Sequence, residues 1–111
     1  MKHKESKIEI SINLDENKIP EKIFWSADDA NIKKQQTKAT FISVWDDKKK
    51  ESLRIDLWTK DMPLDEMKLF FFQIFSGMAQ TYRRATQDDK MTQTILDFTD
   101  YFAEKNDIFK K

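Results

Sequence analysis

The feature that most constrains this chain is a change of apolar period between residues 53 and 67. In the first part apolar and polar residues alternate, which is typical of a strand with one buried face. That face would carry Leu53, Ile55 and Leu57. Pro63 then suits a helix start, where its missing N–H has no partner to lose, and two acidic residues follow in the expected first turn. The stretch therefore predicts a strand that leads into a helix.

The residues before this junction are predicted to form three further strands. Residues 8–14 alternate strictly between aliphatic and polar side chains, and residues 21–26 and 38–45 carry shorter strand patterns. Residues 27–37 lack periodicity and contain turn formers, so we expect a surface loop there. The polar residues 46–51 would close an antiparallel hairpin with the strand at Leu53.

Two helices are predicted after the junction. The first would run from about 63 to 85 and the second from a cap near Thr86 to about 105. The first helix is apolar on most sides, so it needs more than one surface to pack against. Gly77, the only glycine of the chain, lies in its middle. Close packing of a neighbouring helix would explain this glycine, and a kink is the alternative.

These elements predict an α+β fold: a four-stranded antiparallel sheet followed by two C-terminal helices packed on one face. With 111 residues the chain is expected to form a single domain over 1–111, with residues 1–6 frayed.

The composition argues against several classes of function. Twenty basic residues balance twenty acidic ones, so no overall field would attract nucleic acid. There is no cysteine, and the single histidine, His3, lies in the segment expected to be frayed and exposed. We therefore expect no catalytic residues, no metal site and no cofactor, and a protein that is not an enzyme. Because neither a secretory signal nor a membrane-spanning segment is recognisable, a cytoplasmic protein without membrane insertion is expected.

Two groups of residues are candidates for binding another protein. Arg54, Asp56 and Trp58 share the strand face that points away from the expected core. A cross-strand charge pair shielded by the tryptophan would explain them structurally, but tryptophan and arginine are also frequent at interface hot spots. The second group is the apolar surplus: Trp45, Leu69, Phe72 and Phe75. Core packing or a ligand pocket are alternatives for the aromatic residues, and our hypothesis is burial in a homodimer or against a partner.

Three motifs extend the interpretation to a family: residues 19–27 (IPEKIFWSA), residues 53–67 (LRIDLWTKDMPLDEM) and residues 77–81 (GMAQT). With these motifs the chain resembles the small GldC proteins associated with gliding motility in Bacteroidetes bacteria. The resemblance implies a cytoplasmic accessory protein of the gliding and associated secretion machinery, and it brings no catalytic residues. The predicted order of strands and helices is also that of the export chaperone SecB, which is an analogy of fold alone.

The predicted function is therefore a non-enzymatic interaction role within the gliding machinery, in a chain that forms a homo-oligomer. A SecB-like chaperone and a small-ligand-binding protein are the alternatives.

Overall fold

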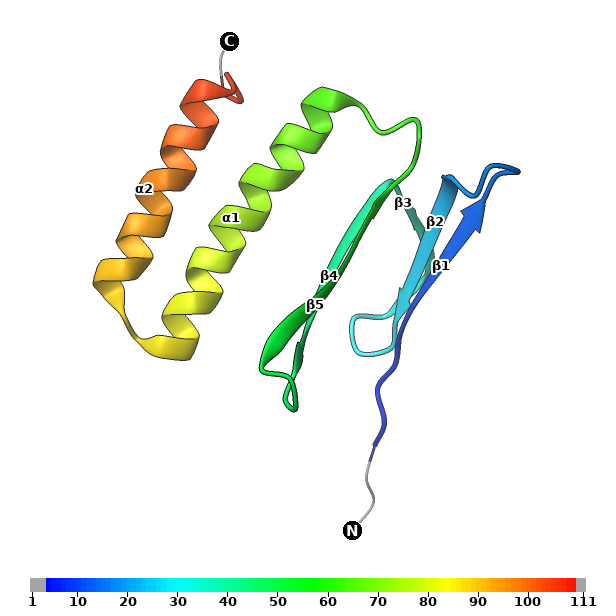
Figure 1. Cartoon of the computed structure of the whole chain (residues 1–111), viewed down its shortest axis with the longest axis horizontal. Coiled ribbons are helices and arrows are strands. Elements are labelled where there is room, and N and C mark those ends of the chain that lie inside the picture. Colours follow the sequence, from blue (N-terminus) through cyan, green and yellow to red (C-terminus); the bar gives the residue numbers. More distant parts are fainter. Residues whose placement is uncertain (1–3, 110–111) are drawn as a thin grey trace. The chain divides into compact units, whose positions relative to one another are not determined.

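The computed structural model describes residues 4–109, which form five strands followed by two helices (Figure 1). The strands belong to one compact unit, which ends at Met62, and the helices belong to a second, which begins at Pro63. An α+β fold with two C-terminal helices is thus confirmed, and the single domain stays a prediction. Residues 1–3, which include His3, lie outside the described residues. The predicted fraying of residues 1–3 and the predicted exposure of His3 therefore fall on residues that the structure does not describe.

The first sheet is three-stranded and antiparallel, in the order β1–β2–β3. Its strands are β1 (Ile8–Leu14), β2 (Pro20–Ala27) and β3 (Ile32–Thr37). The first two lie within a residue of their predicted bounds. The expected loop over 27–37 is wrong, because most of it forms β3.

The third strand escapes the apolar pattern because its middle is polar on both faces. Gln35 pairs with Trp25, and Gln36 pairs with Phe24, so the strand is held by its backbone ladder to β2 rather than by apolar side chains. Asn31 adopts the left-handed conformation (φ 55°) in the turn that leads into β3, a conformation that asparagine tolerates better than most residues.

The second sheet is a two-stranded antiparallel hairpin of β4 (Ala39–Asp46) and β5 (Glu51–Trp58). The carboxylate of Asp46 accepts hydrogen bonds from the backbone N–H groups of Lys48 and Lys49 in its turn, and Lys50 takes a left-handed φ of 55°. The hairpin was predicted, but not its separation from the first sheet. The strands therefore form two sheets instead of one four-stranded sheet.

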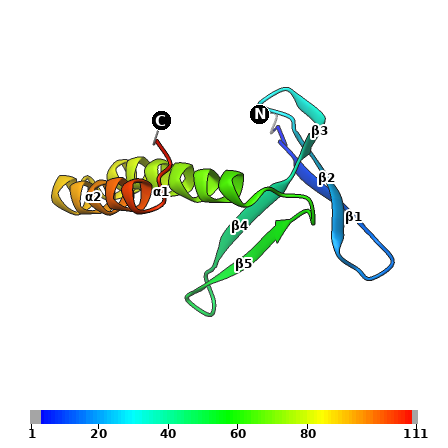
Figure 2. The ribbon, with the colours of Figure 1, turned by 90° about the horizontal axis from the view of Figure 1, so that it is seen from above.

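A backbone hydrogen bond joins the two sheets: the N–H of Lys60, just after β5, donates to the carbonyl of Pro20 in β2 (3.1 Å). The N–H of Thr59 donates to the carbonyl of Lys38 (2.8 Å) and extends the β4–β5 ladder at the same end. Figure 2 shows the hairpin and the three-stranded sheet meeting at this end and diverging toward the hairpin tip. The distal half of the hairpin consequently projects away from the other strands.

The helix unit contains α1 (Leu64–Thr86) and α2 (Asp89–Lys105). Pro63 is the residue before α1, and Asp88 caps α2 by accepting from the N–H of Met91 (2.9 Å). The predicted start of the second helix within residues 86–89 is confirmed, but the cap is Asp88 rather than Thr86. Thr86 still belongs to α1, which ends where Gln87 turns into the left-handed conformation (φ 58°).

Small buried side chains lie in the helix unit: Ala79, Thr92, Thr99 and Ala103. The hydroxyl of Thr92 donates to the carbonyl of Asp88 and that of Thr99 to the carbonyl of Ile95, so the burial of both threonines leaves no donor unsatisfied. Gly77 does not belong to this set. A Cβ built there meets no atom within 4 Å, so close packing does not explain the glycine and that prediction is wrong.

Candidate functional site

The β4–β5 hairpin presents two chemically different faces, as its register shows. Cross-strand partners share a face, so the pairs Phe41–Asp56 and Ser43–Arg54 lie on one side. This side, which we call the Trp face, carries Ala39, Phe41, Ser43, Trp45, Ser52, Arg54, Asp56 and Trp58. The other side, which we call the aliphatic face, carries Thr40, Ile42, Val44, Leu53, Ile55 and Leu57.

The Trp face brings together four of the predicted site residues. Trp45 lies near the hairpin tip and Trp58 at the opposite end, with Arg54 and Asp56 between them. The rise per residue of a strand separates the two tryptophans by roughly 20 Å. Their exposed fractions are 64% for Trp45 and 52% for Trp58, so both rings are available to a partner.

Arg54 and Asp56 form an ion pair along β5 rather than across the hairpin. The Nη2 of Arg54 donates to Oδ1 of Asp56 at 3.0 Å, and its Nε donates to Oδ2 at 3.3 Å. The expected cross-strand charge pair is therefore wrong, because Ser43 stands opposite Arg54. Such exposed pairs stabilise by at most about 1 kcal/mol, so the pair does little for the fold. The two hydrogen bonds fix the position of the guanidinium relative to Asp56 and use two of its five N–H donors.

The aliphatic face contradicts the expectation of a buried strand face. Leu53 is 47% exposed, Ile55 56% and Val44, opposite Leu53, 54%. Toward the base of the hairpin, Ile42 and Leu57 are half-buried. The alternation of apolar residues correctly predicted that these side chains share a face, but it predicted a buried face rather than an exposed one.

The predicted site residues of α1 lie in the helix unit, where aromatic contacts occupy two of them. The ring of Phe75 packs edge-on against Phe98 (5.5 Å between centroids) and Phe102 (5.1 Å), and the ring of Phe72 against Phe109 (5.0 Å). Leu69 is 38% exposed. None of the three is fully buried, but Phe72 and Phe75 already serve the packing of their own unit.

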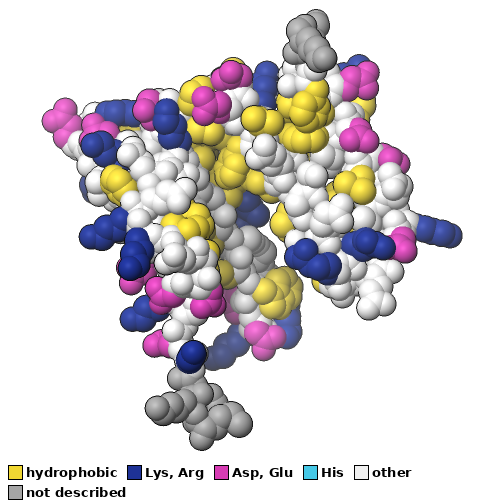
Figure 3. Space-filling view, turned by 180° about the vertical axis from the view of Figure 1, so that it is seen from behind, with side chains coloured by type: hydrophobic (Ala, Val, Ile, Leu, Met, Phe, Trp, Pro, Cys, Tyr) yellow, Lys and Arg dark blue, Asp and Glu magenta, His cyan; other side chains and the backbone are white. Residues whose placement is uncertain are grey.

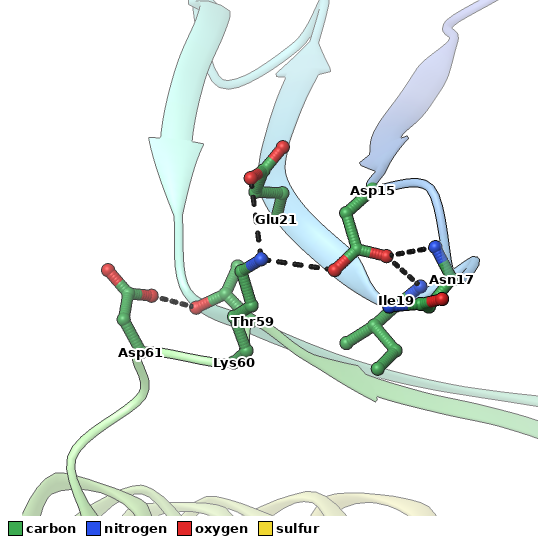
Figure 4. Close-up of polar contacts among 7 residues, drawn as sticks. All are labelled: Asp15, Asn17, Ile19, Glu21, Thr59, Lys60 and Asp61. Atoms are coloured by element: carbon green, nitrogen blue, oxygen red, sulfur yellow. Dashed lines mark hydrogen bonds and ion pairs between the residues drawn. The ribbon is translucent and has the colours of Figure 1, made fainter.

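A polar cluster that the sequence did not predict joins the β1–β2 turn to the segment just after β5 (Figure 4). Lys60, just after β5, places its Nζ 3.0 Å from Asp15 and 3.4 Å from Glu21. The other oxygen of Asp15 accepts from the N–H groups of Asn17 (2.8 Å) and Ile19 (3.0 Å) in the β1–β2 turn. No short motif announces this cluster, because its members are 45 residues apart in the chain.

The cluster is electrostatically satisfied. The backbone N–H of Ile19 and then Lys60 lower the pKa of Asp15, and the hydrogen bond to Asp15 raises the pKa of Lys60. Both groups are thereby held in their charged forms at neutral pH, whereas a general acid or base needs a pKa near the working pH. The arrangement is that of a structural latch between the β1–β2 turn and the end of β5.

The remaining surface offers weak support for small-molecule chemistry. Among residues 4–109, no three histidine, cysteine, aspartate or glutamate side chains are grouped to hold a metal ion. An open groove of about 530 Å³ in the helix unit is lined by Leu64, Leu69 and Ile108 together with charged side chains, among them Glu66 and Lys68. Within the described part of the chain, neither helix combines the length and apolar character needed to cross a bilayer.

Comparison with known proteins decides the family. Residues 20–108 match the family model described as "Gliding motility-associated protein GldC-like". The chain belongs to this GldC-like family. The match runs from the start of β2 to just beyond α2, so it includes the hairpin with both of its faces. It confirms the resemblance stated from the sequence motifs and supports an association with gliding motility, while neither a curated protein nor a solved structure matches the chain.

Proposed function

We propose that this GldC-like chain is a non-enzymatic, cytoplasmic accessory protein of the gliding motility and associated secretion machinery of a Bacteroidetes bacterium. It acts by binding other proteins and by associating with itself. The family supports the link to gliding. The observation that carries protein binding is the Trp face, where two half-exposed tryptophans flank an ion pair on a projecting hairpin.

The Trp face has the chemistry of an interface centre. Tryptophan and arginine are enriched among interface hot spots, and an ion pair that is already formed limits the cost of burying the two charges. Two of the five N–H donors of Arg54 bind Asp56, which leaves others for a partner's carbonyl or carboxylate oxygens. The partner expected here presents an apolar surface with acceptor groups.

Affinity purification of the tagged chain from its native cells tests this proposal. The variant Arg54→Ala/Trp58→Ala should lose components of the gliding apparatus, with little change in melting temperature. The matched control is Asp47→Ala/Lys50→Ala, which removes another exposed ion pair (2.8 Å) from the same hairpin and should retain them. Retention of every partner by the first variant contradicts the proposal. A large fall in its melting temperature would assign these side chains to the fold instead.

A SecB-like chaperone is the second candidate, and the exposed aliphatic face favours it. A chaperone would suppress the aggregation of unrelated unfolded proteins, whereas a dedicated adaptor would not. Light scattering of a heat-denatured client with and without the purified chain distinguishes the two.

A further inference from the structure

We infer that the aliphatic face of the β4–β5 hairpin is the self-association surface of this protein, and that its occupant is a second copy of the chain. The inference rests on the self-association proposed above and gives it a location. It depends neither on a role in gliding nor on the Trp face.

The composition of the face restricts its occupant to an apolar surface. Its three inner rows are Thr40–Leu57, Ile42–Ile55 and Val44–Leu53, and none contains a charged side chain. Charge appears only in the outermost row, Asp46–Glu51, at the hairpin tip. A partner that brought charged groups onto the inner rows would bury them without a counter-charge, which is costly.

The strand unit also needs this face to be covered. An isolated two-stranded hairpin is at best marginally stable in water. Among residues 4–62, the buried apolar side chains are Ile23 and Ala27, both on β2. In the distal half of the hairpin, Val44, Leu53 and Ile55 each expose about half of their surface.

Small units with thin cores are ordinarily reinforced by a disulfide, a metal or oligomerisation. The chain contains no cysteine, and the described residues offer no metal cluster. Oligomerisation reinforces a small unit without either of these.

A second copy fits better than a different protein. An interface that substitutes for missing core must be permanent, and permanent homodimer interfaces are the most apolar class. A two-fold contact also requires a surface complementary to itself, which rows of aliphatic side chains satisfy because they need no opposite charge. The Trp face, on the other side of the same strands, then stays available for another partner.

The test compares the molar mass of the wild type with that of two hairpin variants across the micromolar range. Leu53→Thr/Ile55→Thr keeps residues that favour strands but places hydroxyls on the aliphatic face. We expect the wild type to associate and this variant to do so at least about tenfold more weakly, because the interface would bury the new hydroxyls. The matched control, Trp45→Thr/Trp58→Thr, removes more apolar surface from the opposite face and should associate like the wild type.

The outcomes separate the two claims. A wild type that is monomeric overturns both the proposed self-association and this location, and would assign the face to a different protein. A wild type that associates while Leu53→Thr/Ile55→Thr associates equally well overturns the location alone.

Thiol labelling gives a second readout in case the double variant fails to fold. Because the chain has no cysteine, Ile55→Cys introduces a single thiol on the aliphatic face and Ser43→Cys a single thiol on the Trp face. The Ile55→Cys thiol should be protected at high protein concentration and react faster on dilution, while Ser43→Cys reacts equally fast at all concentrations. A rate for Ile55→Cys that does not depend on concentration overturns the location.

Discussion

The β4–β5 hairpin and the helix pair begin from similarly apolar sequences and use them differently. In the helix pair, Ala79, Thr99 and Ala103 are buried, and Phe75 contacts two aromatic rings of α2. In the hairpin, the face with the clearest alternation leaves Leu53 and Ile55 about half exposed. The two helices therefore bury part of their apolar surface against each other, whereas the hairpin leaves much of the apolar surface of its aliphatic face exposed.

The difference shows what an apolar period encodes. A period states which side chains share a face and would gain free energy from burial. It does not state which element supplies the cover. Neighbouring helices joined by a short turn supply it to each other, but the distal half of the hairpin projects away from the other described strands, which therefore do not cover it.

The largest expected effect concerns the small core that the strand unit does possess. Ile23 has no exposed surface, so Ile23→Ala should lower the free energy of unfolding by roughly 2–4 kcal/mol. Ile8→Ala, at a side chain that is 72% exposed on β1, is the control and should change little. Equilibrium denaturation with urea measures both. If both variants lowered the free energy of unfolding equally, Ile23 would contribute no more to the core of the strand unit than the exposed Ile8.

The aromatic packing of the helix pair should have the next largest effect. Phe75→Leu removes the edge-on contacts with Phe98 and Phe102 and should cost about 1 kcal/mol. Met78→Leu, at a position that is 57% exposed on the same helix, should be close to neutral. Thermal unfolding followed by circular dichroism compares the two. A neutral Phe75→Leu would show that these rings do not hold the helices together.

A smaller effect, of opposite sign, is expected at Gly77. An added Cβ meets nothing within 4 Å and φ is not positive, so Gly77→Ala should stabilise α1 by about 0.5–1 kcal/mol. Ala79→Gly, two residues further at a fully buried position, should destabilise it. A destabilising Gly77→Ala in the same urea titration would indicate that this side of α1 is in contact with another molecule.

The smallest effect is the pH dependence of the latch. The folded pKa of Asp15 lies below its ordinary value of 3.8, so the latch contributes stability above that value and loses it as the pH falls through the folded pKa. Asp15→Asn should therefore reduce stability at neutral pH and weaken the dependence of the melting temperature on pH below about 4. Asp29→Asn, at an exposed turn position, is the control. If the melting temperature of Asp15→Asn depends on pH below about 4 as strongly as that of the wild type, Asp15 does not contribute to the latch.

Much of the local structure could be predicted from particular residues. The strict alternation from Ile8 predicted β1. Pro63 and the two acidic residues of the first turn predicted the start of α1, and the polar stretch after Asp46 predicted the hairpin turn. The strand β3 could not be found in this way. Its ladder to β2 is made by backbone groups, which every residue except proline supplies alike.

The candidate site was predictable in part. Because every second side chain of a strand points to the same face, the sequence alone placed Arg54, Asp56 and Trp58 together. The register of the hairpin adds Trp45 to this face. The alternation of side chains could not show that Phe75 contacts α2 and Phe72 contacts Phe109, nor that Lys60 reaches Asp15. These contacts join distant parts of the chain.

The sequence by itself determined which side chains lie together along each strand and helix, since backbone geometry repeats every two residues or every 3.6. Only the tertiary structure decided that five strands form two sheets and that an aliphatic face lies open to solvent. The physical reason is that burial depends on what stands opposite a side chain, and a periodic pattern carries no information about what stands opposite.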